Sequence, residues 1–259
     1  MLLLNPGVSK MTAEKAVSKC WLIASYRPTA MFSLRMTHAT SKGGKTLLVP
    51  TPYAVKLALI DACFRLHAGD KTYTNAARVF EMIKNRKIRF FPPEHCIVQQ
   101  TFIKIKQQER NAPRGIYTSN IAYREFCYFS GDLAVALDIN GLEEVDRLYL
   151  TELFPRINYL GKRGSFMQFI TCQTWEGPLP RGFSCPENEA DIANGGYAST
   201  NYLDDFSEAL IQSNDGFERI NSYSSKPSNL KYRALIRTLL PYRQESSGKH
   251  FTYYKRLSG

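Results

Sequence analysis

The order of its apolar segments constrains the fold of this chain more than any other feature of the sequence. Residues Cys20 to Arg27 form an apolar run that ends at Pro28, which predicts a buried strand. Four later segments have the same character, and we expect the second and third of them to lie centrally in one sheet: Ile88 to Phe91, Tyr123 to Phe129, Leu133 to Ile139 and Phe166 to Cys172.

Helical patterns separate these strands. A helix is expected from Thr51 to near Gly69, with Pro52 at its first position, and two more are expected at Thr74 to Lys84 and Leu142 to Phe154. The resulting order is strand, helices, strands, helix, strand. This order predicts an α+β sandwich with a largely antiparallel sheet, and a ferredoxin-like arrangement is the leading choice.

The segment from Cys96 to Lys106 alternates between apolar and polar residues, as a half-exposed strand does. The following residues, Gln107 to Thr118, are polar and basic and are interrupted by Pro113 and Gly115. We therefore predict a protruding basic hairpin at about 88–120. It would belong to a body domain that spans residues 1–172.

The chain changes character after Gln173, where prolines and glycines become frequent. Residues 173–259 are expected to form an irregular, extended C-terminal appendage that includes an acidic segment. Within it, Leu230 to Leu240 is expected to be a short basic helix, and Phe251 to Lys255 a final strand that returns to the sheet.

The net charge of +11 is unevenly distributed along the chain. Eight acids and no Lys or Arg lie between Ser184 and Glu218, so the remainder carries 34 bases against 23 − 8 = 15 acids, a balance of +19. Such a field attracts a polyanion, although a basic surface can also serve solubility alone. We expect the acidic segment to dock on a basic neighbouring protein subunit, because RNA would repel it.

Composition excludes several classes of protein. A content of 44% hydrophobic and 12% aromatic residues is too high for a disordered chain, and no apolar run approaches the length of a membrane helix. The apolar start, Met1 to Leu4, is too short for a signal peptide, so we expect a cytoplasmic protein with no membrane contact. Six dispersed cysteines form no metal motif, and we expect no metal and no cofactor.

Two glycine loops are candidates for contact with a phosphate backbone. The first contains Lys42, Gly43, Gly44 and Lys45; it is not a nucleotide-binding P-loop, because Ala39 occupies the position that needs glycine. The second contains Lys162 and Arg163 between glycines. Backbone without bulky side chains can approach phosphates closely, although a solvated turn explains the first loop equally well. Two such loops favour an RNA groove more than one does, and either alone is weak evidence.

The predicted hairpin adds a second kind of candidate. Its bases and one aromatic residue could hold RNA by charge and by stacking on an unpaired base: Lys104, Lys106, Arg110, Arg114 and Tyr117. The alternative is an ordinary exposed hairpin whose lysines keep a strand edge soluble. Tyr123, Phe126 and Tyr128 could form a stacking platform on a sheet face, or could simply be core.

Two further functions remain open. His38 lies beside the first glycine loop and could transfer a proton in metal-independent cleavage of a repeat RNA, with a tyrosine or lysine to assist. A scaffold whose basic surface meets acidic proteins is the third possibility. We expect a binding protein without catalytic residues, since no histidine has a partner at general-base spacing.

Several of these motifs occur together in a known family. The proline-led helix start at Val49 to Val55, the strand start Arg124-Glu125-Phe126 and the loop Tyr159 to Phe166 resemble the Cas-five family of CRISPR-associated RAMP proteins, subunits of the Cascade surveillance complex. The resemblance covers roughly Cys20 to Cys172. It implies a ferredoxin-like (RRM-like) domain with a thumb hairpin.

The resemblance also implies a role and partners. The chain would cap the five-prime handle of the crRNA in a type I complex, with the basic hairpin as the thumb and the glycine loops along the handle groove. It would contact the Cascade backbone subunit and the large subunit. Target DNA would be selected by pairing with the guide and reach this chain only through the complex.

Overall fold

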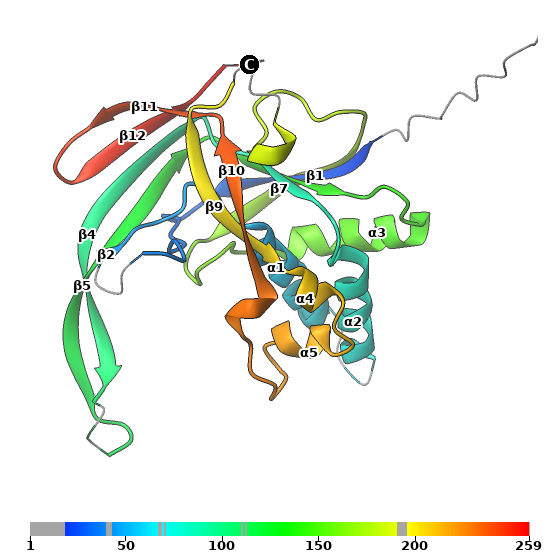
Figure 1. The fold of residues 1–259 in the computed structure, drawn as a ribbon, viewed down its shortest axis with the longest axis horizontal. Coiled ribbons are helices and arrows are strands. Elements are labelled where there is room, and N and C mark those ends of the chain that lie inside the picture. The colour runs from blue at the N-terminus through cyan, green and yellow to red at the C-terminus, as the bar shows by residue number, and fades with distance from the viewer. Residues whose placement is uncertain are drawn as a thin grey trace, which may run out of the picture.

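The computed structural model describes residues 19–39, 43–66, 69, 71–109, 111, 113–190 and 196–258 (Figure 1). The apolar start at Met1 to Leu4 and two predicted RNA-binding residues, Lys42 and Arg110, lie outside these ranges. Within them, no helix combines the length and the apolar run that crossing a bilayer requires.

A four-stranded antiparallel sheet forms the centre of the body. Its strands are β1 (Cys20–Pro28), β3 (Ile88–Phe91), β6 (Leu133–Asp138) and β7 (Met167–Glu176), in the spatial order β3-β6-β1-β7. The central strand β1 pairs with β6 on one side and with β7 on the other. Five consecutive residues of β1 are buried because both faces of the sheet are covered. Helices cover one face, and Phe183 covers Trp21 and Ile23 on the other.

Three helices connect the strands of this sheet: α1 (Pro52–Leu66), α2 (Thr72–Ile83) and α3 (Glu144–Leu153), the last extended by a 3₁₀ turn at Phe154–Arg156. Helix α1 begins at Pro52 because Thr51 Oγ1 accepts a hydrogen bond of 3.1 Å from Ala54 N. The order of strands and helices is that of a ferredoxin-like fold. The prediction of an α+β fold with an antiparallel sheet is therefore confirmed.

A second sheet of five strands lies beside the body and extends away from it (Figure 1). Its order is β11-β12-β4-β5-β2, with β2 at Gly43–Gly44, β4 at His95–Gln108, β5 at Tyr117–Ser130, β11 at Tyr242–Ser247 and β12 at Phe251–Arg256. Strands β4 and β5 form a long antiparallel hairpin, which we call the arm.

The arm corresponds to the hairpin predicted at about 88–120, but its strands occupy residues 95–130. Residues Ile88–Phe91 belong to the central sheet instead, because Pro92 and Pro93 end β3 before β4 begins. The prediction that Tyr123 to Phe129 lies in the same sheet as Leu133 to Ile139 is wrong, since β5 pairs with β4 and not with β6.

The C-terminal part of the chain is more regular than the predicted appendage. It contains a three-stranded sheet in the order β8-β10-β9, made of Cys185–Pro186, Arg233–Leu240 and Ser199–Phe206, with short helices α4 (Glu208–Ile211) and α5 (Gly216–Ile220). The predicted helix at Leu230 to Leu240 is wrong: a single 3₁₀ turn, Leu230–Tyr232, precedes strand β10. Pairing of β10 with β9 over eight residues overrides the local helical preference of this segment. The final strand, β12, pairs with β4 rather than with the central sheet.

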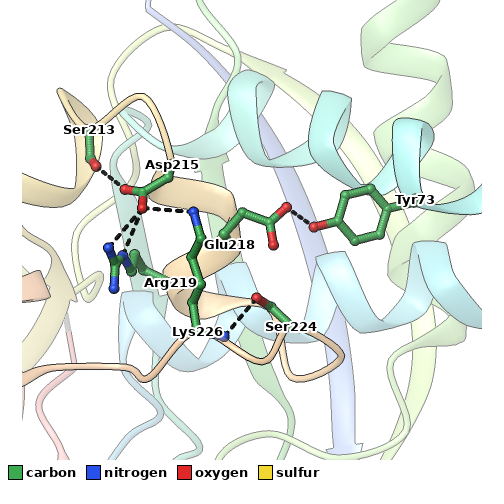
Figure 2. A network of polar contacts seen from close by, with 7 residues as sticks. All are labelled: Tyr73, Ser213, Asp215, Glu218, Arg219, Ser224 and Lys226. Carbon is green, nitrogen blue, oxygen red and sulfur yellow. Dashed lines mark hydrogen bonds and ion pairs between the residues drawn. The ribbon is translucent and has the colours of Figure 1, made fainter.

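The acidic segment is largely neutralised inside the molecule. Its carboxylates form ion pairs with bases of the same chain: Glu187 with Arg237, Glu189 with Lys87 and Arg89, Asp204 with Arg233, Asp205 with Lys56, and Asp215 with Arg219 and Lys226. Figure 2 shows the cluster around Asp215. The expectation that this segment docks on a basic neighbour is not supported, because most of its charge already has a partner.

Candidate nucleic-acid interface

One face of the arm gathers two of the predicted lysines and an aromatic pair. Residues directly opposite in an antiparallel pair share a face, so Phe102, Lys104 and Lys106 of β4 face the same side as their partners Tyr123, Ile121 and Ser119 of β5. The rings of Phe102 and Tyr123 lie 4.1 Å apart between centroids. Phe102 is 61% exposed and Tyr123 is 44% exposed. We call this side of the arm the inner face.

The predicted residues near the end of the arm are less closely grouped. Tyr117 lies opposite Gln108 on the inner face and is 59% exposed. Arg114 is exposed in the turn that joins the two strands. The described part of the arm therefore presents Lys104, Lys106 and Tyr117 on one face, and Arg114 at its end.

The first glycine loop lies at the base of the arm. Gly43 and Gly44 pair in parallel with Tyr123 and Arg124 of β5. A Cβ atom on Gly44 would lie 2.7 Å from Cδ and from Nη1 of Arg124, so glycine allows the arginine side chain to lie across the loop. Lys45 follows and is exposed.

The second glycine loop is joined to the same region through Ser33. Ser165, which ends that loop, accepts a hydrogen bond of 3.1 Å from Ser33 N at its Oγ, and Ser33 Oγ donates one of 3.0 Å to Glu125 O. Glu125 Oε2 in turn accepts one of 2.9 Å from Thr46 N. Ser33, Thr46 and Ser165 are all buried. This chain of hydrogen bonds fixes both glycine loops against β5.

Positive backbone torsions shape the second loop. Gly161 has φ +83° and Gly164 has φ +103°, and Ser165 N donates a hydrogen bond of 3.0 Å to Lys162 O between them. Lys162 and Arg163 are exposed at the tip of this turn. The tight turn therefore presents two adjacent cations to solvent.

A groove of about 340 Å³ opens between the first glycine loop and the arm. Its lining consists of His38, Ala39, Gly44, Lys45, Gln100, Tyr123, Arg124 and Glu125. Of the predicted RNA-binding residues that the structure describes, only Gly44 and Lys45 line it. Lys104 and Lys106 lie farther along the inner face, and Lys162 and Arg163 belong to the other loop.

Sequence reasoning did not select Phe102, Arg124 or Gln100 for this site. Phe102 could have been found, because the alternation of β4 places it on the same face as Lys104 and Lys106. The position of Arg124 beside Gly44 depends on the pairing of β2 with β5, and nothing in the local sequence signals that pairing.

The chemistry of the groove suits a polyanion with bases. Lys45 and Arg124 supply positive charge, while the carboxylate of Glu125 is engaged by a backbone amide. Burial raises the pKa of the nearby Cys127 thiol well above its usual value, so this thiol stays neutral. The ring of His38 packs edge-on against Tyr202 at 6.1 Å. Among the described residues, His, Cys, Asp and Glu form no group of three that could hold a metal ion.

Comparison with known proteins gives a family likeness. No protein-family model matches the chain. A curated relative from Archaeoglobus fulgidus, named CRISPR-associated protein Cas5, is 24% identical over 153 residues, which are 59% of this chain and 63% of the relative. The chain thus spans less than two thirds of that relative's length. This relative confirms the resemblance to the Cas-five family.

Solved structures show weaker likeness. A crystal structure of a CRISPR protein from Archaeoglobus fulgidus aligns over 92% of each chain with 11% identity and a TM-score of 0.44. A chain of a Type III-B Cmr-beta structure bound to cognate target RNA aligns over 61% of each chain, with 10% identity and a TM-score of 0.44. A chain of a CRISPR RNA-guided surveillance complex aligns over 92% of this chain and 90% of that one, with 12% identity and a TM-score of 0.34.

Proposed function

We propose that this relative of a Cas5 protein is a non-catalytic RNA-binding subunit of a CRISPR effector complex of type I, where it caps the five-prime handle of the guide RNA. The observation that supports this function most strongly is the grouping of Gly44, Lys45 and Tyr123 around one groove at the base of a basic arm. The ring of Phe102 lies next to that of Tyr123, 4.1 Å away between centroids. Phosphates would be held by the loop and the lysines. Unpaired bases would stack on the rings.

In this proposal the other components of the complex complete the site. The arm projects from the body in Figure 1, so a backbone subunit and a large subunit could contact it while the groove holds RNA. Target DNA would meet the guide within the complex and be read by base pairing. The chain itself would read only the handle and its free end.

Salt-dependent binding tests the role of the arm. We expect the purified chain to bind a repeat-derived RNA whose handle is at the five-prime end more tightly than an RNA that carries the same handle internally. Replacing Lys104→Gln and Lys106→Gln should flatten the slope of log K against log salt by about 1.4, at about 0.7 per phosphate on a single strand. The measurement is fluorescence anisotropy over a salt series.

A charge-matched variant controls for the loss of net charge. Lys71 precedes α2 and Lys231 lies in the turn before β10, and Figure 1 shows α2 and the start of β10 away from the end of the arm. Lys71→Gln with Lys231→Gln should therefore leave the slope nearly unchanged. Equal salt slopes for the two double variants would show that the arm is not part of the RNA interface. Failure of the parent chain to bind any RNA would favour the scaffold reading instead.

A second candidate function has one observation in its favour. His38, Lys45 and Tyr123 line the same groove, and this set could support metal-independent RNA cleavage by proton transfer. Incubating the repeat RNA with the chain separates the two functions. The binding role predicts intact RNA, whereas site-specific cleavage that disappears in His38→Ala would establish an endoribonuclease.

A further inference from the structure

The opposite side of the five-stranded sheet carries exposed rings that the proposed groove does not use. Odd-numbered residues of β4 point to this side, which we call the outer face. Here Tyr253 of β12, Ile97 of β4 and Tyr128 of β5 form one row of cross-strand neighbours, and Phe251, Gln99 and Phe126 form the next. The sheet thus places two aromatic residues of β12 and two of β5 on one side, with Ile97 and Gln99 of β4 between them.

Two of these rings are open to solvent although they belong to a well-paired sheet: Tyr128 is 56% exposed and Phe251 is 45% exposed. Phe126 and Tyr253 are half-buried, and Ile97 between the strands is 37% exposed. Their neighbours on the inner face at the same level, Cys96, Val98 and Cys127, are buried in the core, so the exposure is confined to one side. Of the three residues that the sequence suggested for a stacking platform, Phe126 and Tyr128 lie on the outer face, whereas Tyr123 lies on the inner face.

Charge around the outer face favours an anionic occupant. Lys255 lies on the same side of β12 as Phe251 and Tyr253, and its strand neighbour on β11 is Arg243. Lys249 is exposed in the turn between these strands. Of the nearby acids, Glu245 is held by Arg243 at 2.8 Å and Glu94 lies 3.3 Å from His95. Aromatic rings bordered by cations match a strand that has both bases and phosphates.

The spacing of the rings also fits. Side chains two residues apart on a strand lie about 7 Å apart, and alternate strands lie about 10 Å apart. Successive bases in a stacked nucleic-acid strand lie about 3.4 Å apart. A base that stacks on a side-chain ring instead of on the next base is therefore separated from that base by about twice this distance. Tyr253 is also held in place, because its hydroxyl lies 2.8 Å from His95 Nδ1.

We propose that the outer face of β12, β4 and β5 is a second binding surface, which takes single-stranded nucleic acid by stacking bases on Phe251, Tyr253 and Tyr128. The surface shares none of its residues with the described lining of the groove, so the two can be tested separately. It would let the chain hold one strand in the groove and a second strand outside it.

Binding of short homopolymers tests this surface. The probes are single-stranded oligouridine and oligothymidine of about ten nucleotides, a length within the site size of single-strand binding folds. In a background that already carries Lys104→Gln and Lys106→Gln, the change Tyr128→Leu with Phe251→Leu should weaken binding by about tenfold for each base that loses its ring. Comparing the two probes shows whether RNA or DNA is preferred.

The matched control keeps the rings. Tyr128→Phe with Phe251→Tyr should bind as the parent does, and duplex DNA should bind the leucine and control variants equally. Because both positions are exposed, thermal midpoints should agree among all variants. Oligothymidine that contains 5-iodouracil should crosslink on irradiation to the peptides with Tyr128 and Phe251.

Each other outcome overturns the proposal. Unchanged affinity of the leucine variant, or crosslinks confined to the groove, would show that the outer face does not hold a nucleic-acid strand. Loss of a co-purifying protein with unchanged oligonucleotide affinity would make it a protein-docking surface. If the groove and the arm do not bind RNA, the salt slope will be unchanged in the lysine variants, which is a separate measurement.

Discussion

At the scale of single residues, Lys56 has an unusual environment. It lies on α1 and is 1% exposed, and its Nζ donates to Asp205 Oδ1 at 2.6 Å and to Lys84 O at 3.1 Å. Burial lowers the pKa of Lys56, and the carboxylate of Asp205 opposes that shift. Because Asp205 belongs to β9, this pair fastens the C-terminal part of the chain to the helices.

Removing the ammonium group should be costly. Lys56→Met leaves Asp205 as a buried charge without its partner, so the free energy of unfolding should fall by about 3–5 kcal/mol. Urea denaturation measures the change. The exposed control Lys71→Met should cost less than about 0.5 kcal/mol, and adding Asp205→Asn to Lys56→Met should recover part of the loss. Equal stability of Lys56→Met and parent would contradict the role of the pair.

The partners of single residues show where sequence reasoning stops. Alternation along β4 was enough to place Lys104 and Lys106 on one face. Nothing local indicated that Lys56 is buried, because the carboxylate that compensates it comes from a strand far along the chain. From the sequence, all basic residues were counted toward a field that attracts a polyanion. Several of them, such as Arg233, instead form ion pairs with carboxylates of the acidic segment.

At the scale of elements, the turn between α4 and α5 is organised by one carboxylate. Asp215 accepts hydrogen bonds from Ser213 Oγ at 2.6 Å and from Lys226 Nζ at 3.0 Å, and pairs with Arg219 at 2.8 Å (Figure 2). Tyr73 of α2 donates to Glu218 of the same region. The hydrogen bonds from Ser213, Lys226 and Arg219 lower the pKa of Asp215 far below its usual range.

The lowered pKa predicts a pH-dependent contribution to stability. The unfolded carboxyl takes up a proton near pH 3.9, whereas the folded one resists protonation, so the stabilisation is present above that pH and is lost as the pH falls. Asp215→Asn should therefore lower the thermal midpoint at about pH 6, and the difference from the parent should shrink at about pH 3.5.

A carboxylate from the same region serves as the control. Glu208 accepts a hydrogen bond only from Gln212 of its own turn among the contacts described, and Glu208→Gln should change the midpoint little at either pH. A difference for Asp215→Asn that does not vary with pH would mean that the carboxyl is not perturbed.

Elements differed in how well their sequences specified them. The long apolar run of β1 and the capped start of α1 were predicted correctly, because local patterns are sufficient there. Strand β10 was mistaken for a helix, since its structure comes from pairing with β9. Strand β5 was placed in the wrong sheet, because the break at Pro92 and Pro93 redirects the chain but does not say where it goes.

At the scale of the whole molecule, the C-terminal hairpin of β11 and β12 completes the base of the arm. Strand β12 pairs with β4 from Phe251 opposite Gln99 to Lys255 opposite His95. Tyr242 is fully buried, and its hydroxyl donates to Pro93 O at 2.8 Å. Arg256 lies over the ring of Phe91 at 3.9 Å. The hairpin therefore connects the arm to the central sheet.

Removing residues 241–259 should expose the edge of β4 and open this junction. The shortened chain should have a lower thermal midpoint and should associate into larger species on size-exclusion chromatography. The control Tyr242→Phe keeps the ring and loses only the bond to Pro93, which costs about 1 kcal/mol. A shortened chain that stays monomeric with the parent's midpoint would show that β12 is dispensable.

The pairing of β12 with β4 also bears on how the chain reaches its native state. The partners Phe251 and Gln99 are 251 − 99 = 152 positions apart, and contacts of such long range slow folding. Once a ribosome has delivered the chain as far as the end of β7 at Glu176, the ferredoxin-like body can already assemble. The arm must wait with an open strand edge until translation supplies its neighbour, so this edge is the place where a nascent chain most needs a chaperone.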